Sequence, residues 1–216
     1  MAFMIENQQQ DEDRIIYLSS DISDSSTSDI CKQIISYNEA DRKGIARYRQ
    51  YQIKPIYLYV QSFGGSVYDM WALIDIMESS NTPIITYCTG YCMSAAADIF
   101  LAGHYRYMYK HASIMMHQMS TIAYGKITDI KLEQKQMDLL HKRSIKYLKK
   151  RTKLPKKFYK RYDVGKEDIY LTAKDCLKWG ICDKIVQKTD WRPELIEQMN
   201  EIESDLIESG FANDTE

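Results

Sequence analysis

The sequence predicts an α/β fold with a mostly parallel sheet. Short runs rich in β-branched and aromatic residues alternate along the chain with segments whose apolar residues recur at helical spacing. Two of the strand-like runs pass through glycine directly into a helix, within residues 60–67 and 88–97. Because parallel strands are joined by crossover connections, which are usually helices, this alternation indicates right-handed crossovers within one sheet.

Six short runs are expected to form strands. They cover residues 14–19, 56–60, 84–88, 105–109, 113–117 and 185–186. Most are rich in β-branched or aromatic residues, which is typical of strands. Pro55 introduces the second run, and Gly90 is expected to end the third.

Helices are expected between these strands wherever apolar residues recur every three or four positions. They cover residues 28–38, 68–79, 93–103, 126–151 and 171–180. Ser28 or Asp29 is the expected cap of the first helix, and Thr82-Pro83 follows the end of the second. Residues 39–54 are charged and lack clear periodicity, so we expect a loop or an extension of the first helix.

The composition is that of one folded domain. The 216 residues are 44% hydrophobic, which allows a sizeable core. The net charge is -1, from 29 basic and 30 acidic residues, so nothing in the balance calls for a nucleic acid or a membrane as partner. A basic run at residues 149–161 lacks an accompanying aromatic stacking platform. No apolar stretch reaches the ~20 residues that a membrane span needs.

The N-terminus and the cysteines indicate a cytoplasmic protein. Residues 1–13 are polar, have no long apolar run, and are expected to form a short mobile segment. The five cysteines include no metal-type pair, which indicates free thiols in a reducing compartment. We therefore expect no metal site.

Both junctions of strand, glycine and helix are suited to stabilising an oxyanion. Glycine lets backbone amides face outward, and the start of a helix presents unpaired N–H groups with partial positive charge. Ser94 lies at the second junction, before three alanines whose small side chains leave room for a substrate. A serine nucleophile needs a base, and the base needs an orienting acid. His117 ends an apolar strand and is the candidate base; a histidine bonded to a backbone carbonyl at the edge of the core is the alternative.

Four segments resemble motifs of the Clp protease proteolytic subunit, in the family's order and at similar intervals, from about residue 14 to 186. They are YLYVQSFGGSV for the glycine turn, GYCMSAAA for the nucleophile turn, SIMMHQ for the histidine strand and DIYLTAKDCLKWGICDKI for the aspartate segment. The spacing Gly-x-x-x-Ser differs from the Gly-x-Ser-x-Gly turn of the α/β-hydrolases.

This resemblance implies a serine endopeptidase with roles for five residues. Ser94 matches the nucleophile, and His117 matches the general base. Asp168 matches the acid that holds the imidazole tautomer. The backbone N–H groups of Gly65 and Ala95 match the oxyanion hole. The implied reaction is amide hydrolysis through an acyl-enzyme.

The resemblance also implies an architecture and an assembly. The fold would be a ClpP/crotonase-like ββα superhelix over residues 14–190, with residues 126–151 as a protruding helical handle and an acidic C-terminal extension over 191–216. Two stacked seven-membered rings, a tetradecamer, would enclose the active sites. An AAA+ unfoldase would use ATP and feed unfolded proteins into the barrel, so this chain itself would need no cofactor. Tyr57 and Tyr59 match aromatic positions of the pocket that receives the unfoldase's loops; simple strand packing explains them equally well.

Three features depart from the family pattern. Only 13 residues precede Arg14, where the family has a longer segment with an axial loop. The connection over residues 39–54 is longer than the usual one. After His117 the chain reads QMSTIAYGK, without the family's proline and paired glycines. We therefore expect pore gating and unfoldase docking to differ from the family's.

Other readings of the motifs stay open. A phage-type prohead maturation protease of the same superfamily would use the same chemistry. A signal-peptide peptidase would use serine with lysine, which the presence of His117 and Asp168 disfavours. A crotonase-type hydratase or isomerase would need carboxylates at the two turns and no serine nucleophile. A non-catalytic structural subunit would need no aligned triad.

Overall fold

The structure, a computed structural model, describes residues 14–122, 124–165 and 167–186. Up to Ile185 the described residues belong to one compact unit. The predicted N-terminal segment over 1–13 and the predicted extension over 191–216 lie outside the described residues.

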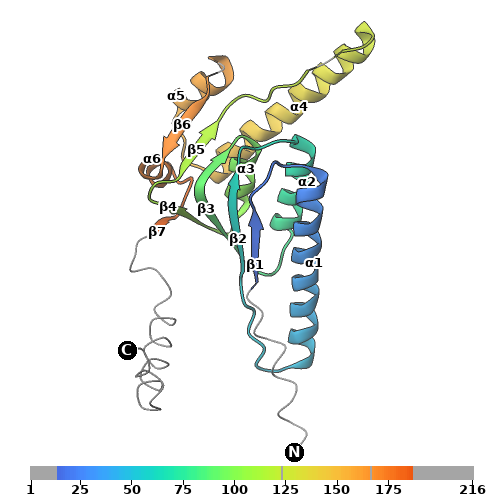
Figure 1. The fold of residues 1–216 in the computed structure, drawn as a ribbon, viewed down its shortest axis with the longest axis vertical. Coiled ribbons are helices and arrows are strands. Elements are labelled where there is room, and N and C mark those ends of the chain that lie inside the picture. Colours follow the sequence, from blue (N-terminus) through green and yellow to red (C-terminus); the bar gives the residue numbers. More distant parts are fainter. Residues whose placement is uncertain (1–13, 123, 166, 187–216) are drawn as a thin grey trace, which may run out of the picture. The chain divides into compact units, whose positions relative to one another are not determined.

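Strands and helices alternate along the described chain as far as β4, which is followed directly by β5 (Figure 1). The strands are β1 (Ile15–Leu18), β2 (Ile56–Ser62), β3 (Ile84–Met93), β4 (Tyr105–Tyr109), β5 (Ser113–Met116), β6 (Ile169–Thr172) and β7 (Lys184–Val186). The helices are α1 (Asp24–Arg47), α2 (Val67–Glu78), α3 (Ala95–Ala102), α4 (Ile127–Arg151), α5 (Lys156–Tyr159) and α6 (Ala173–Lys178), with a π-helical turn at Lys160–Val164.

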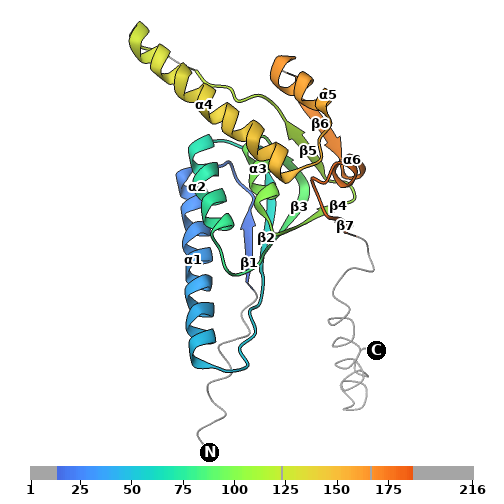
Figure 2. The same ribbon diagram turned by 180° about the vertical axis from the view of Figure 1, so that it is seen from behind.

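The sheet is mostly parallel, as predicted. Its strands follow the order β1-β2-β3-β4-β7, and β5 pairs with both β3 and β6. The pairs β1/β2, β2/β3, β3/β4 and β3/β5 are parallel, and β5/β6 is antiparallel. Helix α1 packs on α2, and α2 packs on α3, so that these helices cover one face of the sheet (Figures 1 and 2). No helix in the described ranges is long and apolar enough to span a bilayer.

Helix α1 begins earlier than the sequence predicts. It begins at Asp24 because Ser23 and Ser26 form a capping box, in which each hydroxyl accepts a hydrogen bond from the other's N–H. The predicted start at Ser28 or Asp29 was therefore wrong. Of the two alternatives for residues 39–54, an extension of the first helix holds as far as Arg47. The extension was hidden because its buried positions are an aspartate and a glycine, which give no apolar periodicity.

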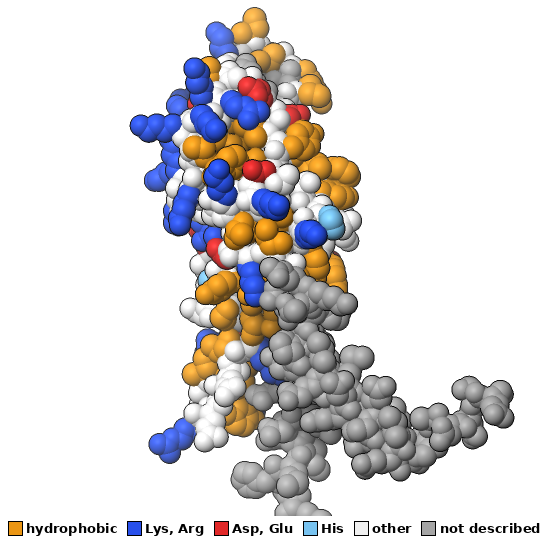
Figure 3. Space-filling view, turned by 90° about the vertical axis from the view of Figure 1, so that its left-hand side faces the viewer, with side chains coloured by type: hydrophobic (Ala, Val, Ile, Leu, Met, Phe, Trp, Pro, Cys, Tyr) orange, Lys and Arg blue, Asp and Glu red, His pale blue; other side chains and the backbone are white. Residues whose placement is uncertain are grey.

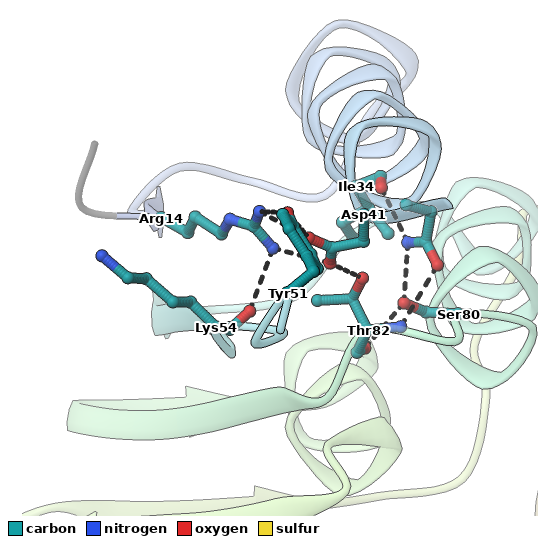
Figure 4. A network of polar contacts seen from close by, with 8 residues as sticks. Arg14, Ile34, Asp41, Tyr51, Lys54, Ser80 and Thr82 are labelled. Carbon is teal, nitrogen blue, oxygen red and sulfur yellow. Dashed lines mark hydrogen bonds and ion pairs between the residues drawn. The ribbon is translucent and has the colours of Figure 1, made fainter. Parts of the chain in front are cut away.

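The buried aspartate of α1, Asp41, joins four parts of the chain (Figure 4). Both of its oxygens accept hydrogen bonds from the Arg14 guanidinium, at 2.7 Å each. The Tyr51 hydroxyl donates to it at 2.6 Å, and the Thr82 hydroxyl donates to it as well. Burial alone would raise the pKa of Asp41, but these hydrogen bonds outweigh it and hold the pKa below its usual value. The network fixes the connection between α1 and β2.

Strand β3 does not end at Gly90 as predicted but bends there. Gly90 has φ 75°, a conformation that glycine adopts without steric cost. The step from Val60 to Ser62 in β2 faces the step from Cys88 to Cys92 in β3, so β3 accommodates a bulge. Before the bulge β3 pairs with β4, and after it β3 pairs with β5. Strand β3 therefore changes its pairing partner at the bulge, and its C-terminal end pairs with β5.

The C-terminal half departs from the predictions at β6. The predicted helix over residues 171–180 begins only at Ala173, because Thr172 and Asp175 form a capping box there. Leu171 and Thr172 instead belong to β6, which pairs with β5. Helix α4 has the predicted extent, and only its C-terminal half, from Leu140 on, carries buried residues. Its N-terminal half projects from the sheet (Figure 1).

Candidate active site

Ser94 occupies a strained turn between β3 and α3. Its φ of 52° makes it the only non-glycine residue with positive φ in the described part of the chain. Such a conformation costs roughly 1–3 kcal/mol and persists only where the surroundings enforce it. Here the Ser94 N–H donates to the Met115 carbonyl at 2.8 Å, and the Ala97 N–H donates to the Ser94 carbonyl at 2.9 Å. The turn therefore holds the Ser94 hydroxyl in a fixed direction at the start of α3.

His117 lies within hydrogen-bond distance of Ser94. The parallel pairing of β3 with β5 sets Met93 beside Met115, so that Ser94 and His117 leave the two strands as neighbours. His117 Nε2 is 2.8 Å from Ser94 Oγ. When the imidazole is neutral and protonated on Nδ1, the serine hydroxyl donates to Nε2, which is the arrangement of a nucleophile with its base. The alternative, a histidine bonded to a backbone carbonyl, is not what the structure contains.

Asp168 lies near the other side of the imidazole but not in contact with it. Antiparallel pairing of Met116 with Ile169 places His117 and Asp168 side by side at the ends of β5 and β6. Asp168 Oδ1 is 3.6 Å from His117 Nδ1, beyond hydrogen-bond distance, and its side chain is 57% exposed. Catalytic hydrogen bonds are often long in the absence of substrate. The structure thus assembles the serine and the histidine and leaves the aspartate slightly apart.

Gly65 and Ala95 are the two residues whose backbone N–H groups match an oxyanion hole. The bridge between Gly65 and Ile22 uses the Gly64 carbonyl and the Ser66 N–H, which leaves the Gly65 N–H out of the pairing. Ala95 is the first residue of α3, so its N–H has no acceptor within the helix. Gly65 and Ala95 line the same cavity as Ser94 and His117. The oxyanion-hole role that the resemblance implies for these two N–H groups stays a prediction.

The cavity at Ser94 has a volume of about 70 Å³. Side chains from α2, α3, α4, the end of β5 and the π-helical turn converge on it. Its lining includes Val67, Met70, Asp98, Met116, Met119, Ser120, Leu148 and Tyr162. Burial raises the pKa of Asp98 to about 7. Sequence analysis missed Asp98; the available signal was a lone acidic residue in an otherwise apolar helix, one turn after Ser94.

The two tyrosines matched to an unfoldase pocket lie elsewhere, on the face of the sheet opposite the helices. Along β2 the buried residues alternate with half-buried Tyr57 and Tyr59. Tyr59 stacks on Tyr17 at 5.2 Å and on Tyr87 at 4.7 Å between ring centroids, and Tyr87 stacks on Tyr107 at 5.1 Å. These side chains form a continuous tyrosine stripe across β1, β2, β3 and β4, defined here by Tyr17, Tyr59, Tyr87 and Tyr107. Side-chain packing between neighbouring strands accounts for part of this tyrosine stacking.

The aromatic side chains in and beside the basic run at residues 149–161 pack against the protein itself. Phe158 and Tyr162 are buried, and Lys149 Nζ lies over the Tyr159 ring at 5.3 Å. Seen from the side on which α5, β6 and α6 lie in Figure 1, lysine and arginine side chains are interspersed with hydrophobic ones (Figure 3). In the described ranges no three His, Cys, Asp or Glu side chains are grouped to hold a metal ion.

Comparison with known families identifies the chain. The family model for the Clp protease matches residues 4–189, which is most of the 216 residues. The mostly parallel sheet with its helices is the fold that this match implies. The match includes the two glycine turns, the strand that ends at His117 and the segment around Asp168. The chain therefore belongs to the Clp protease family.

Proposed function

We propose that the protein is a serine endopeptidase that hydrolyses peptide bonds of unfolded proteins through Ser94, His117 and Asp168. Membership of the Clp protease family supports a peptidase in general. The observation that carries the specific assignment is the 2.8 Å distance between Ser94 Oγ and His117 Nε2, in a cavity that Gly65 and Ala95 also line.

The proposed reaction follows from this geometry. Ser94 Oγ attacks the scissile carbonyl while His117 Nε2 accepts the hydroxyl proton. The N–H groups of Gly65 and Ala95 stabilise the oxyanion, where each donor is worth about 2.7–4 kcal/mol in the transition state. His117 then returns the proton to the leaving amine, and the C–N bond breaks to give the acyl-enzyme. Water, activated by the same imidazole, releases the product acid and restores Ser94.

Asp168 is proposed to orient the imidazole once substrate or a neighbouring subunit is in place. A hydrogen bond to His117 Nδ1 needs a shift of roughly half an ångström from the 3.6 Å separation. Asp168 is exposed and precedes the short strand β6, so such a shift requires no repacking of the core. With the bond formed, the carboxylate stabilises the imidazolium that develops during attack.

Self-assembly into stacked rings is part of the proposal. The N-terminal half of α4 carries three apolar side chains that are largely exposed in the monomer, Ile127 (73%), Leu132 (67%) and Leu139 (55%). Exposed apolar residues grouped on a projecting helix mark a contact surface. A helix that inserts between the corresponding helices of an opposing ring would cover them, as the family's handles do.

An AAA+ unfoldase is the proposed partner, and the tyrosine stripe supports a docking surface on the sheet. Tyrosine suits such surfaces because it combines a large apolar ring with a hydrogen-bonding hydroxyl. The unfoldase would consume ATP, and the chain itself is proposed to use no metal or cofactor. We also propose a cytoplasmic location, because the chain's five cysteines are free thiols, which is typical of a reducing compartment.

A non-catalytic structural subunit is the second candidate, and the open distance between Asp168 and His117 is the observation that favours it. Fluorophosphonate labelling separates the two. Wild type and Ser94→Ala are labelled and passed over a sizing column, with Ser120→Ala as the matched control because Ser120 lines the same cavity. Labelling of wild type and Ser120→Ala alone, in a ring-sized peak, supports the peptidase. Equal reaction of Ser94→Ala, or no reaction of wild type in a ring-sized peak, contradicts it.

A further inference from the structure

The cavity beside Ser94 contains a carboxyl group that the proposed reaction does not use. Asp98 lies in the first turn of α3, which begins directly after Ser94. Ser94, Asp98 and His117 all line the cavity of about 70 Å³. A side chain that enters this cavity from a scissile carbonyl at Ser94 would therefore reach toward Asp98.

Asp98 lies among both apolar and uncharged polar groups, the latter including the hydroxyls of Ser94 and Ser120. Three methionines, Met70, Met116 and Met119, line the cavity together with Leu148. Among the described residues, no side chain or backbone group forms a hydrogen bond or ion pair with the Asp98 carboxyl; only its backbone carbonyl is bonded, by the Tyr147 hydroxyl at 3.2 Å. A half-buried carboxylate without a partner is less favourable than one in water, and a bound cation would stabilise it.

Three titratable side chains lie near Asp98 on the elements around it. Tyr147 on α4 bonds to the Asp98 backbone carbonyl, and Tyr162 on the π-helical turn and His117 after β5 line the same cavity. Burial first, and then the nearby charge of Asp98, raise the pKa of both tyrosines, so they remain protonated. No lysine or arginine lines the cavity in the described part of the chain. The missing partner is a cation.

We propose that this cavity receives the side chain on the acyl side of the scissile bond and that Asp98 selects a cationic one, lysine above all. The inference rests on the proposed peptidase function and names its substrate class. The methylene groups of lysine would pack against the methionines, and its ammonium would meet the carboxylate.

Burial of the Asp98 carboxyl makes the predicted preference for lysine depend on pH. It raises the pKa of Asp98 to about 7, so near neutral pH the empty cavity holds a carboxyl that is partly protonated. A bound ammonium favours the ionised form and binds more tightly to it. Preference for lysine should therefore strengthen as the pH rises through 7, whereas binding of an uncharged side chain should weaken.

Two peptides that differ only in charge test the inference. One ends in lysine and the other in norleucine, which has the same length without the ammonium. Their binding to the Ser94→Ala protein is measured by fluorescence anisotropy at about pH 8. We expect the lysine peptide to bind about tenfold tighter or more, and Asp98→Asn in the same background to abolish or reverse that ratio. Asp75→Asn, an exposed position on α2, is the control that should keep it.

The outcomes separate this inference from the proposed function. Equal binding of the two peptides, binding of neither, or a ratio that Asp98→Asn leaves unchanged overturns the inference, even if wild type reacts with fluorophosphonate. A lysine preference that depends on Asp98 supports it, even if wild type fails to react and the peptidase proposal falls. If the Asp98→Asn protein does not fold, the relative binding of the lysine and norleucine peptides to the Ser94→Ala protein, which retains Asp98, still tests the inference.

Discussion

Gly64 lies against Ser94 so closely that no side chain fits between them. A Cβ atom on Gly64 would lie 2.8 Å from the Ser94 Cβ atom and 2.8 Å from the Met93 carbonyl oxygen, and Gly64 has φ 105°. The first glycine turn thus supports the second turn, on which Ser94 stands. A side chain added at Gly64 in the first turn would therefore displace Ser94 in the second turn.

Gly64→Ala should therefore lower the activity about 100-fold. The added methyl group must displace Ser94 or the Met93 carbonyl, and a displacement of about 1 Å at a reacting atom costs about 100-fold in rate. The measurement is the rate of fluorophosphonate labelling. Gly125→Ala is the control, because Gly125 has a similar φ of 134°, but among the described residues, its chain neighbours aside, no atom lies closer than 3.7 Å to an added Cβ. Labelling of Gly64→Ala at the wild-type rate would show that the two turns are not coupled.

Asp168→Asn should lower kcat by roughly 10³–10⁴-fold with little change in KM, because the amide can hold the imidazole in the wrong tautomer. The readout is peptide hydrolysis in the assembled protein. Asp163→Asn is the matched control, since Asp163 is an exposed carboxylate that pairs with a different histidine, His141, at 2.8 Å. If both variants behave alike, Asp168 does not orient the imidazole and the 3.6 Å gap persists in the working enzyme.

Asp98→Asn should stabilise the protein at high pH and not at low pH. Burial raises the folded-state pKa of Asp98 to about 7, above its ordinary value of 3.8. The folded state therefore binds this proton more tightly, and the stability that Asp98 contributes is complete below its ordinary pKa and is lost as the pH rises toward 7. We expect a gain of roughly 2–4 kcal/mol in unfolding free energy at about pH 8, and almost none at about pH 4. Urea denaturation of both proteins measures it; an equal gain at both values would mean that charge is not the cause.

Arg14→Ala should destabilise the fold by about 3–5 kcal/mol, because it leaves Asp41 as a buried charge without its main partner. The side chains of Arg14 and Asp41 are 12% and 4% exposed. Arg42→Ala breaks an ion pair with Glu39 on the surface of the same helix, where both partners are well exposed, and should have little effect. Chemical denaturation compares them. Similar midpoints for the two variants would argue against the network as the anchor of the connection before β2.

The sequence predicted what depends on local pattern and missed what depends on distant contacts. The fold class and the positions of Ser94 and His117 follow from strand runs and glycine turns that are local. The caps of α1 and α6 were also local, as Ser23 with Ser26 and Thr172 with Asp175, but were overlooked.

The far half of α1 could not be predicted in the same way. Asp41 is buried there only because Arg14 and Thr82, far away in the chain, satisfy it. The cavity at Asp98 likewise exists only where α2, α4 and the π-helical turn meet α3, which no periodicity reveals.

The central claim, that His117 activates Ser94, is tested most directly by the second-order rate constant for phosphonylation of Ser94. The adduct is located by mass spectrometry, and wild type is compared with His117→Ala, with His104→Ala as a control outside the cavity. The account predicts that Ser94 carries the adduct and that His117→Ala reacts about 10²–10⁴ times more slowly, while the control reacts normally. Equal rates for wild type and His117→Ala, or an adduct on another residue, would contradict it.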